Sequence, residues 1–184
     1  VPPTVGIASP DGSLSVQVTT DNDGRPNYAV LRRGKTIITP SRLGFLFLDS
    51  PKFERNFFIA RHTDSSFDQT WEQPWGERRS IRNHYNELRV TLTEKNALKR
   101  SIDVVFRVYD DGLGFRYEFP KQAGLEVVRI GSELTEFNIA EPATAWWIPA
   151  GEWNREEYLY HRTPVQEVGD AQTPITLRTE NGLH

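Results

Sequence analysis

The chain contains no cysteine, and this absence excludes two kinds of site. Without cysteine it can form neither a disulfide framework nor a thiolate metal site. Methionine is absent as well, initiator included, so we expect the sequence to be a processed or excised piece of a longer protein. No apolar run approaches the ~20 residues that a membrane span requires, and residues 1–4 lack the basic and apolar regions of a signal peptide.

An excess of positive charge is also missing. The 184 residues include 22 basic and 25 acidic side chains, mixed along the sequence, for a net charge of −3. Proteins that bind nucleic acid neutralise phosphates with a basic stripe or patch. We therefore expect no nucleic-acid partner.

No segment carries a sustained apolar stripe of helical period; the dominant period is two. Leu14, Val16 and Val18 alternate with polar residues, as in a strand with one wet face. The clearest hairpin joins residues 102–108 to residues 113–119 through a turn at 110–112. Many short strands separated by Gly, Pro, Asn and Asp predict an all-β fold, an antiparallel sandwich or barrel.

Further strands are expected elsewhere in the chain. They cover residues 28–31, 36–38, 43–48, 56–62, 66–71, 81–93, 126–130, 134–137, 144–148 and 174–179. Residues 152–160 have room for one helical turn between Pro149 and Pro164. The hairpin signal Asn181-Gly182 follows the last strand without a return strand, which predicts a C-terminally truncated domain with an unpaired edge. We expect such a fragment to self-associate.

Three segments combine aromatic, charged, proline and glycine residues in a way that is unusual for ordinary solvent-facing strands. Residues 71–88 read WEQPWGERRSIRNHYNEL, residues 106–120 read FRVYDDGLGFRYEFP, and residues 145–149 read AWWIP. In order and spacing these segments resemble the N-terminal domain of glycoside hydrolase family 97, and a further match is SPDG at residues 9–12.

The resemblance implies a fold and a role. It implies a large antiparallel β-sandwich, related to the galactose mutarotase fold, with residues 1–184 forming most of one N-terminal domain. The catalytic (β/α)8 barrel and the C-terminal domain would lie outside this chain. The parent would be a periplasmic or secreted bacterial enzyme that hydrolyses α-glucosidic or α-galactosidic bonds of an oligosaccharide with calcium. This domain would buttress the barrel and carry no catalytic residue.

An acidic loop, residues 151–158, is the best candidate for chemistry. Carboxylates beside aromatic residues suit a hard cation or sugar hydroxyls, although an acidic loop is usually a solvated face. In the family, a Glu-Tyr pair after the strand with the AxWIP motif brings one glutamate to the active-site calcium. That pair corresponds to Glu157 and Tyr158 here, or to Glu156 if the alignment is shifted by one residue.

Aromatic residues near this loop are candidates for a substrate pocket, since an indole face packs on a pyranose ring. Trp146 and Trp147 are adjacent in an expected strand, so their side chains should point to opposite faces, one of them into the core. The other, with Trp153 and Tyr158, is a candidate to line a site. We carry Trp147, Trp153 and Tyr158 forward as pocket candidates.

His84 is the last candidate. It shares parity with Leu88, Val90 and Leu92, so it should point towards the sandwich interior. It would belong either to a ligand-facing polar cluster or to a buried network that fixes strand register. Two rival functions remain: a stand-alone carbohydrate-binding module, and an aldose-epimerase-like enzyme with His84 and a glutamate as acid/base pair.

Overall fold

The computed structural model describes residues 3–151 and 157–182, which form two compact units, Val1–Asn138 and Ile139–His184. The described residues are built almost entirely from antiparallel strands, with one short 3₁₀ helix. Among them, no helix is long and apolar enough to span a membrane.

The first sheet of unit 1 is an antiparallel meander. It contains β1 (Val5–Ala8), β2 (Leu14–Thr20), β3 (Pro26–Arg32) and β4 (Lys35–Arg42) in that order. The alternation seen in the sequence decides which face is buried: Val16 pairs with Val30 and Val18 pairs with Tyr28, and all four are buried. This face of the sheet turns towards the second sheet.

The second sheet is also a meander, built from two longer and two shorter strands. It contains β6 (Phe57–Glu72), β7 (Ser80–Glu94), β8 (Ser101–Val108) and β9 (Leu113–Glu118). Leu88 pairs with Phe106, and Val90 pairs with Val104, all of them fully buried. The predicted hairpin forms as expected, and the Tyr109 N–H donates to the Gly112 carbonyl at 2.8 Å.

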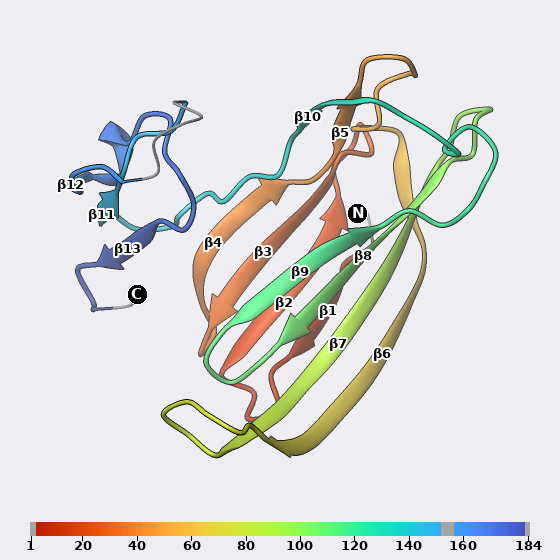
Figure 1. Cartoon of the computed structure of the whole chain (residues 1–184). Helices are drawn as coiled ribbons and strands as arrows, with labels where there is room; N and C mark the ends of the chain where they lie inside the picture. The colour runs from red at the N-terminus through yellow and green to blue at the C-terminus, as the bar shows by residue number, and fades with distance from the viewer. Residues whose placement is uncertain (1–2, 152–156, 183–184) are drawn as a thin grey trace. The chain divides into compact units, whose positions relative to one another are not determined.

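The two sheets face each other and enclose one hydrophobic core (Figure 1). Aromatic rings bridge the layers, since Tyr28 of β3 lies 6.0 Å from Phe106 and 5.2 Å from Phe115 between ring centroids. A small sheet of β5 (Phe45–Phe47) and β10 (Ile130–Glu133) carries Phe45, which meets Tyr117 edge-on at 4.8 Å. The predicted all-β antiparallel sandwich is confirmed.

A buried ion pair fixes the loop after β5. Arg100 and Glu94 are 2% and 1% exposed, and their charged atoms lie 2.7 Å apart. Arg100 also donates to the Ser50 hydroxyl and the Pro51 carbonyl, and its guanidinium lies 4.8 Å from the centroid of the Phe53 ring. Full pairing is what allows two charges to sit in an apolar interior.

Unit 2 is a three-stranded antiparallel sheet. The strand β11 (Ala143–Trp147) lies between β12 (His161–Pro164) and β13 (Thr176–Thr179), and the 3₁₀ helix η1 (Val165–Glu167) follows β12. At the end of β13 the Gly182 N–H donates to the Thr179 carbonyl at 3.0 Å, so the turn signalled by Asn181-Gly182 forms.

Several expected strand boundaries are wrong. The expected strands at 56–62 and 66–71 are one strand, β6, because β7 pairs along its whole length. The strands expected at 126–130 and 134–137 are replaced by β10 alone, and β1 and β12 were not predicted. Of the expected helical turn at 152–160, residues 157–160 are not helical and residues 152–156 lie outside the described residues.

Candidate functional site

The central strand of unit 2 sends its two tryptophans to opposite faces. Trp147 lies with its ring stacked on His161, 5.0 Å between centroids, and its indole N–H donates to the Thr163 hydroxyl at 3.1 Å. Both tryptophans are half-buried, so the expectation that one belongs to a core is wrong. The buried positions of β11 are Ala143 and Ala145, which share a face of the strand with Trp147.

Trp146 lies on the other face of this sheet, between two arginine side chains. Arg162, its direct partner on β12, has its guanidinium carbon 5.6 Å from the indole centroid, and Arg178 of β13 lies at 5.8 Å. A guanidinium within ~6 Å of an indole face is attracted by the ring quadrupole. Two cross-strand arginines therefore hold Trp146 and give this face a positive charge.

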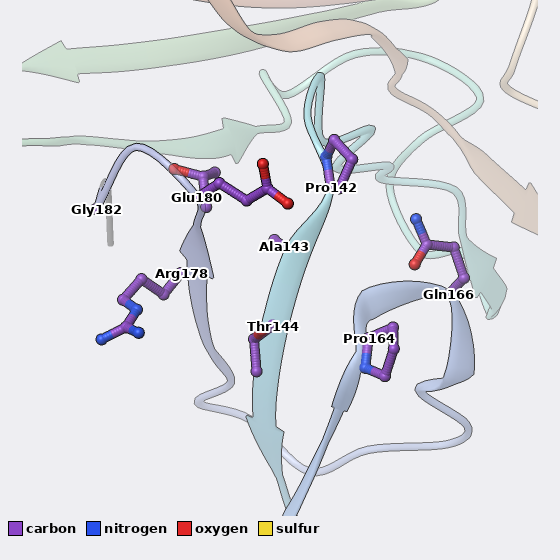
Figure 2. Close-up of a pocket in the computed structure, with 9 residues that line it drawn as sticks. Pro142, Ala143, Thr144, Pro164, Gln166, Arg178, Glu180 and Gly182 are labelled. Atoms are coloured by element: carbon purple, nitrogen blue, oxygen red, sulfur yellow. The ribbon is translucent and has the colours of Figure 1, made fainter.

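A pocket of about 420 Å³ opens on unit 2 (Figure 2). Pro142 and Thr144 enter it from the β11 side, Pro164 and Gln166 from the β12 side, and Arg178 and Glu180 from the β13 side. The lining combines a cation, one carboxylate, an amide and two threonine hydroxyls with two proline rings. Such a lining can hydrogen-bond several hydroxyl groups of one small polar ligand.

Glu157 and Tyr158 lie between β11 and β12, outside the residues that line this pocket. Glu157 is exposed and Tyr158 is half-buried. The alternative ligand Glu156 and the pocket candidate Trp153 lie outside the described residues. The described residues contain no group of three or more His, Asp or Glu side chains that could hold a metal ion by themselves.

His84 belongs to unit 1, on β7. It faces the same side of the sheet as Leu88, as its parity predicted, but its side chain is 30% exposed. The expected burial is wrong because β8 ends its pairing at Asn86↔Val108, so β7 at His84 has already left the two-layer core. The acidic partner of His84 is Asp68, its cross-strand neighbour on β6, with 4.0 Å between Nε2 and Oδ2.

The sequence analysis did not single out Arg162 or Arg178. Neither stands in a motif, and β12 carried no strand signal because its His161–Pro164 segment is largely exposed and contains a proline. Only the strand pairing shows that these two arginines flank Trp146. The site residues predicted in unit 2 are near one another in the chain, but Trp147 and Glu157 are not among the residues that line the pocket of Figure 2.

Comparison with known proteins identifies the relatives of this chain. The model of the glycosyl-hydrolase 97 N-terminal family matches residues 7–184. A glycoside hydrolase family 97 enzyme from Pseudoalteromonas sp., solved in complex with panose and with acarbose, superimposes with a TM-score of 0.90 at 39% identity. The match covers 96% of this chain and 27% of that enzyme.

Two further relatives are more distant. The structure of a beta-arabinopyranosidase superimposes with a TM-score of 0.82 at 25% identity, over 96% of this chain and 30% of that one. A protein of Bacteroides thetaiotaomicron named retaining alpha-galactosidase is 27% identical over 139 residues, which are 76% of this chain and 19% of that protein. The chain thus spans about a quarter of the length of the proteins it matches, and it belongs to the glycosyl-hydrolase 97 N-terminal family.

Proposed function

We propose that the chain is the non-catalytic N-terminal β-sandwich of a periplasmic or secreted, calcium-dependent α-glycosidase. In this proposal it buttresses a (β/α)8 barrel and supplies one ligand to the active-site calcium. The observation that carries the proposal is the match over residues 7–184 to the N-terminal family of glycoside hydrolase family 97. The parent protein would add the catalytic domain, since the chain covers 27% of the family 97 enzyme from Pseudoalteromonas sp..

The non-catalytic role assigns the acid pair of the reaction to the catalytic domain of the parent protein. Hydrolysis of a glycosidic bond uses two carboxyl groups, about 5–5.5 Å apart in retaining enzymes and about 6.5–9.5 Å apart in inverting ones. Three pockets formed by described residues each contain one acidic side chain. These are Glu180, Glu72 and Asp23. None of these three pockets offers the pair that the chemistry needs.

The acidic loop of unit 2 fits the role of one calcium ligand. Calcium takes six to eight oxygen ligands, and an exposed carboxylate such as Glu157 is of the right chemical type. The described residues do not add two further acidic groups to it, so most of the coordination shell would come from the barrel. When bound, the ion would supply positive charge beside the sugar. The domain's own task would be to hold the Glu157 carboxylate at the domain boundary.

The substrate is proposed to be an α-glucoside. The relative with the higher identity, 39%, was solved with panose, a trisaccharide of glucose, and with acarbose. The relative named alpha-galactosidase is 27% identical. An α-galactoside is the alternative, and parallel assays of the full-length protein with both aryl glycosides decide between them.

A second candidate, a carbohydrate-binding module, is favoured by the pocket in Figure 2 and by the indole of Trp146 on the same sheet. The discriminating measurement is calorimetric titration of the 184-residue chain with panose. Binding that Arg178→Ala weakens would favour the module. No heat at millimolar sugar favours the N-terminal domain of an enzyme.

The proposed calcium role is tested in the full-length enzyme with a matched pair of variants. Glu157→Gln should weaken calcium affinity and lower activity together, with excess calcium restoring part of the rate, because the amide is a poorer ligand than the carboxylate. Glu156→Gln should change neither. If Glu156→Gln causes both losses while Glu157→Gln causes none, the register is shifted by one residue. If neither variant has an effect, the calcium role of this loop is refuted.

A further inference from the structure

The hairpin of β6 and β7 reaches well beyond the sandwich. In β7, residues 86–93 pair with β8, whereas residues 80–85 pair with β6 alone. Figure 1 shows this free end of the hairpin passing the turn between β8 and β9. A two-stranded ribbon outside the core has two faces, and the side chains on these two faces differ in polarity.

The face that continues the sandwich interior is polar and internally paired. Arg82 binds Asp68 through two hydrogen bonds of 2.8 and 2.6 Å, and the hydrogen bonds from Arg82 lower the pKa of the Asp68 carboxyl. Further along, Ser66 donates to the Asn86 side-chain oxygen at 2.7 Å, and the Asn86 amide donates to the Ala8 carbonyl. These groups have partners within the domain.

The opposite face is aromatic. Phe67 of β6 stacks on its cross-strand neighbour Tyr85 with 5.3 Å between centroids and 21° between planes. Tyr109 continues the row at 5.2 Å from Tyr85, and Trp71 lies on the same face nearer the turn, 48% exposed. We call Phe67, Trp71, Tyr85 and Tyr109 the aromatic face. Phe67 and Trp71 are its exposed members, at 38% and 48%, whereas Tyr85 is 7% exposed and supports them from below, with the Arg107 guanidinium 4.6 Å from its ring centroid. The nearby guanidinium of Arg107 is paired with Glu87 at 2.8 Å, so it adds no free charge.

The turn of the hairpin holds one more indole, Trp75, which is 82% exposed. The turn is tightly built, since the Gln73 backbone N–H donates to the Arg79 carbonyl at 3.0 Å and its side-chain amide to the Arg78 carbonyl at 2.6 Å. Gly76 has φ of +122°, and a Cβ there would lie 2.5 Å from the Gln73 amide nitrogen. An ordered turn that keeps a tryptophan in water has the character of a preorganised anchor.

We propose that the aromatic face and Trp75 form the surface on which the catalytic domain of the same polypeptide docks. Buried tryptophan and tyrosine side chains dominate the binding energy of interfaces, and exposed aromatic patches mark them. Because Arg107 is paired with Glu87 and Arg79 with Glu72, these residues add little free charge to the aromatic face, which suits an apolar partner surface.

Two arguments favour the catalytic domain as the partner that covers the aromatic face: the length of the relative outside this domain, and the covalent link between the two domains. The chain covers 27% of its solved relative, so in such a protein most of the polypeptide lies outside this domain. A tethered partner is present at an effective concentration of the order of millimolar, which a second copy or a free sugar seldom reaches. The identity of the partner rests on the proposed function, but the surface itself does not.

The test is hydroxyl-radical footprinting of Trp71 and Trp75, read by mass spectrometry. The full-length protein, shown by sedimentation to be monomeric at the working dilution, is compared with the 184-residue chain. Docking predicts that oxidation of Trp75 slows by about tenfold or more in the full-length protein, since an anchor residue loses its contact with water. Leu98, exposed in the turn between β7 and β8, is the internal reference.

Each alternative outcome overturns the proposal. Equal oxidation in both proteins means that the surface is free. Protection that appears only at concentrations where dimers form assigns it to a second copy, and protection that requires added panose assigns it to a sugar.

A matched pair of variants adds a functional readout. Trp75→Ala in the full-length protein should open the domain junction to limited proteolysis at least about tenfold faster, as expected for loss of a hot spot, whereas Leu98→Ala should not. Turnover and calcium affinity of the unmodified enzyme test the proposed function separately. Protection of Trp75 in a protein without glycosidase activity would leave the docking surface standing and refute the α-glycosidase.

Discussion

Unit 1 and unit 2 are both antiparallel sheets, yet they are stabilised differently. The sandwich of unit 1 encloses a continuous core of valine, leucine and aromatic side chains. In the described part of unit 2, the buried apolar side chains are two alanines, Ala143 and Ala145. Burial of apolar area is the main favourable term in folding, so unit 1 can carry its own stability and unit 2 much less so.

The candidate functional residues fall mostly in unit 2, with His84 in unit 1 as the exception. Trp146, Trp147 and Glu157 all belong to the unit with the thin sheet. Segments that bind ligands are commonly drawn from the less stable parts of a protein, because they gain their order from what they bind. In the proposed function, the sandwich would serve as the scaffold and unit 2 would present the calcium ligand.

The largest expected effect is a loss of stability on replacing Arg100 of unit 1, compared with replacing Arg162 of unit 2. Arg100→Ala leaves the buried Glu94 carboxylate without its partner, and we expect a loss of about 3–5 kcal/mol in the free energy of unfolding. Arg162→Ala removes an exposed stacking contact and should cost at most about 1 kcal/mol. Urea denaturation followed by circular dichroism measures both.

An isosteric control separates packing from charge. Replacing both partners, with Arg100→Met and Glu94→Leu, should recover most of the loss, because an apolar pair of similar volume avoids the cost of burying charge. Equal losses in the free energy of unfolding for Arg100→Ala and Arg162→Ala would contradict the claim that unit 1 is stabilised more strongly than unit 2.

The second-largest expected effect is a difference between the two units in the rate of amide hydrogen exchange. The amides of β8, central in the buried sheet, should exchange only on global unfolding, whereas those of β11 should exchange faster by about two orders of magnitude. Mass spectrometry on peptic peptides resolves the two strands. In the full-length protein, β11 should gain protection while β8 changes little; uniform protection of both strands in the 184-residue chain would contradict the scaffold account.

The smallest expected effect is a loss of stability of unit 1 at high pH. Burial raises the pKa of Tyr117 from 10.0 to about 12, and its hydroxyl lies 2.7 Å from the Thr135 hydroxyl. Between pH 10 and pH 12 the unfolded chain therefore loses this proton while the native state keeps it, so stability should fall as pH rises. Thermal melts at pH 9 and pH 11 should show a smaller difference in midpoint for Tyr117→Phe than for the unmodified chain. An unchanged difference would mean that Tyr117 does not contribute.

The sequence predicted strands best where one face is buried. Residues 102–108 and 113–119 alternate because one side meets the core, and their hairpin was predicted correctly. The sequence predicts a break in β6 at residues 63–65, because these exposed polar residues carry no apolar alternation. The pairing with β7 makes them part of one continuous strand.

The candidate site was less predictable, for a related reason. Motif and parity named Glu157, Trp147 and His84 as candidates, and this stays a prediction; parity gave the correct face for His84. Its exposure depends on where the neighbouring strand β8 stops, and the sequence of β7 holds no information on that. The arginines around Trp146 depend likewise on the register of β11 with two strands.

The central claim is that catalysis belongs to the parent protein outside these 184 residues. Its most direct test is turnover of aryl α-glucosides and α-galactosides by the 184-residue chain, shown to be folded by circular dichroism, beside the full-length protein. The full-length protein should hydrolyse one of the two substrates, and the chain alone should match the buffer blank, because loss of acid/base groups each worth ~10²–10⁴ in rate leaves nothing to measure. Turnover by the isolated chain that survives repurification would contradict the account.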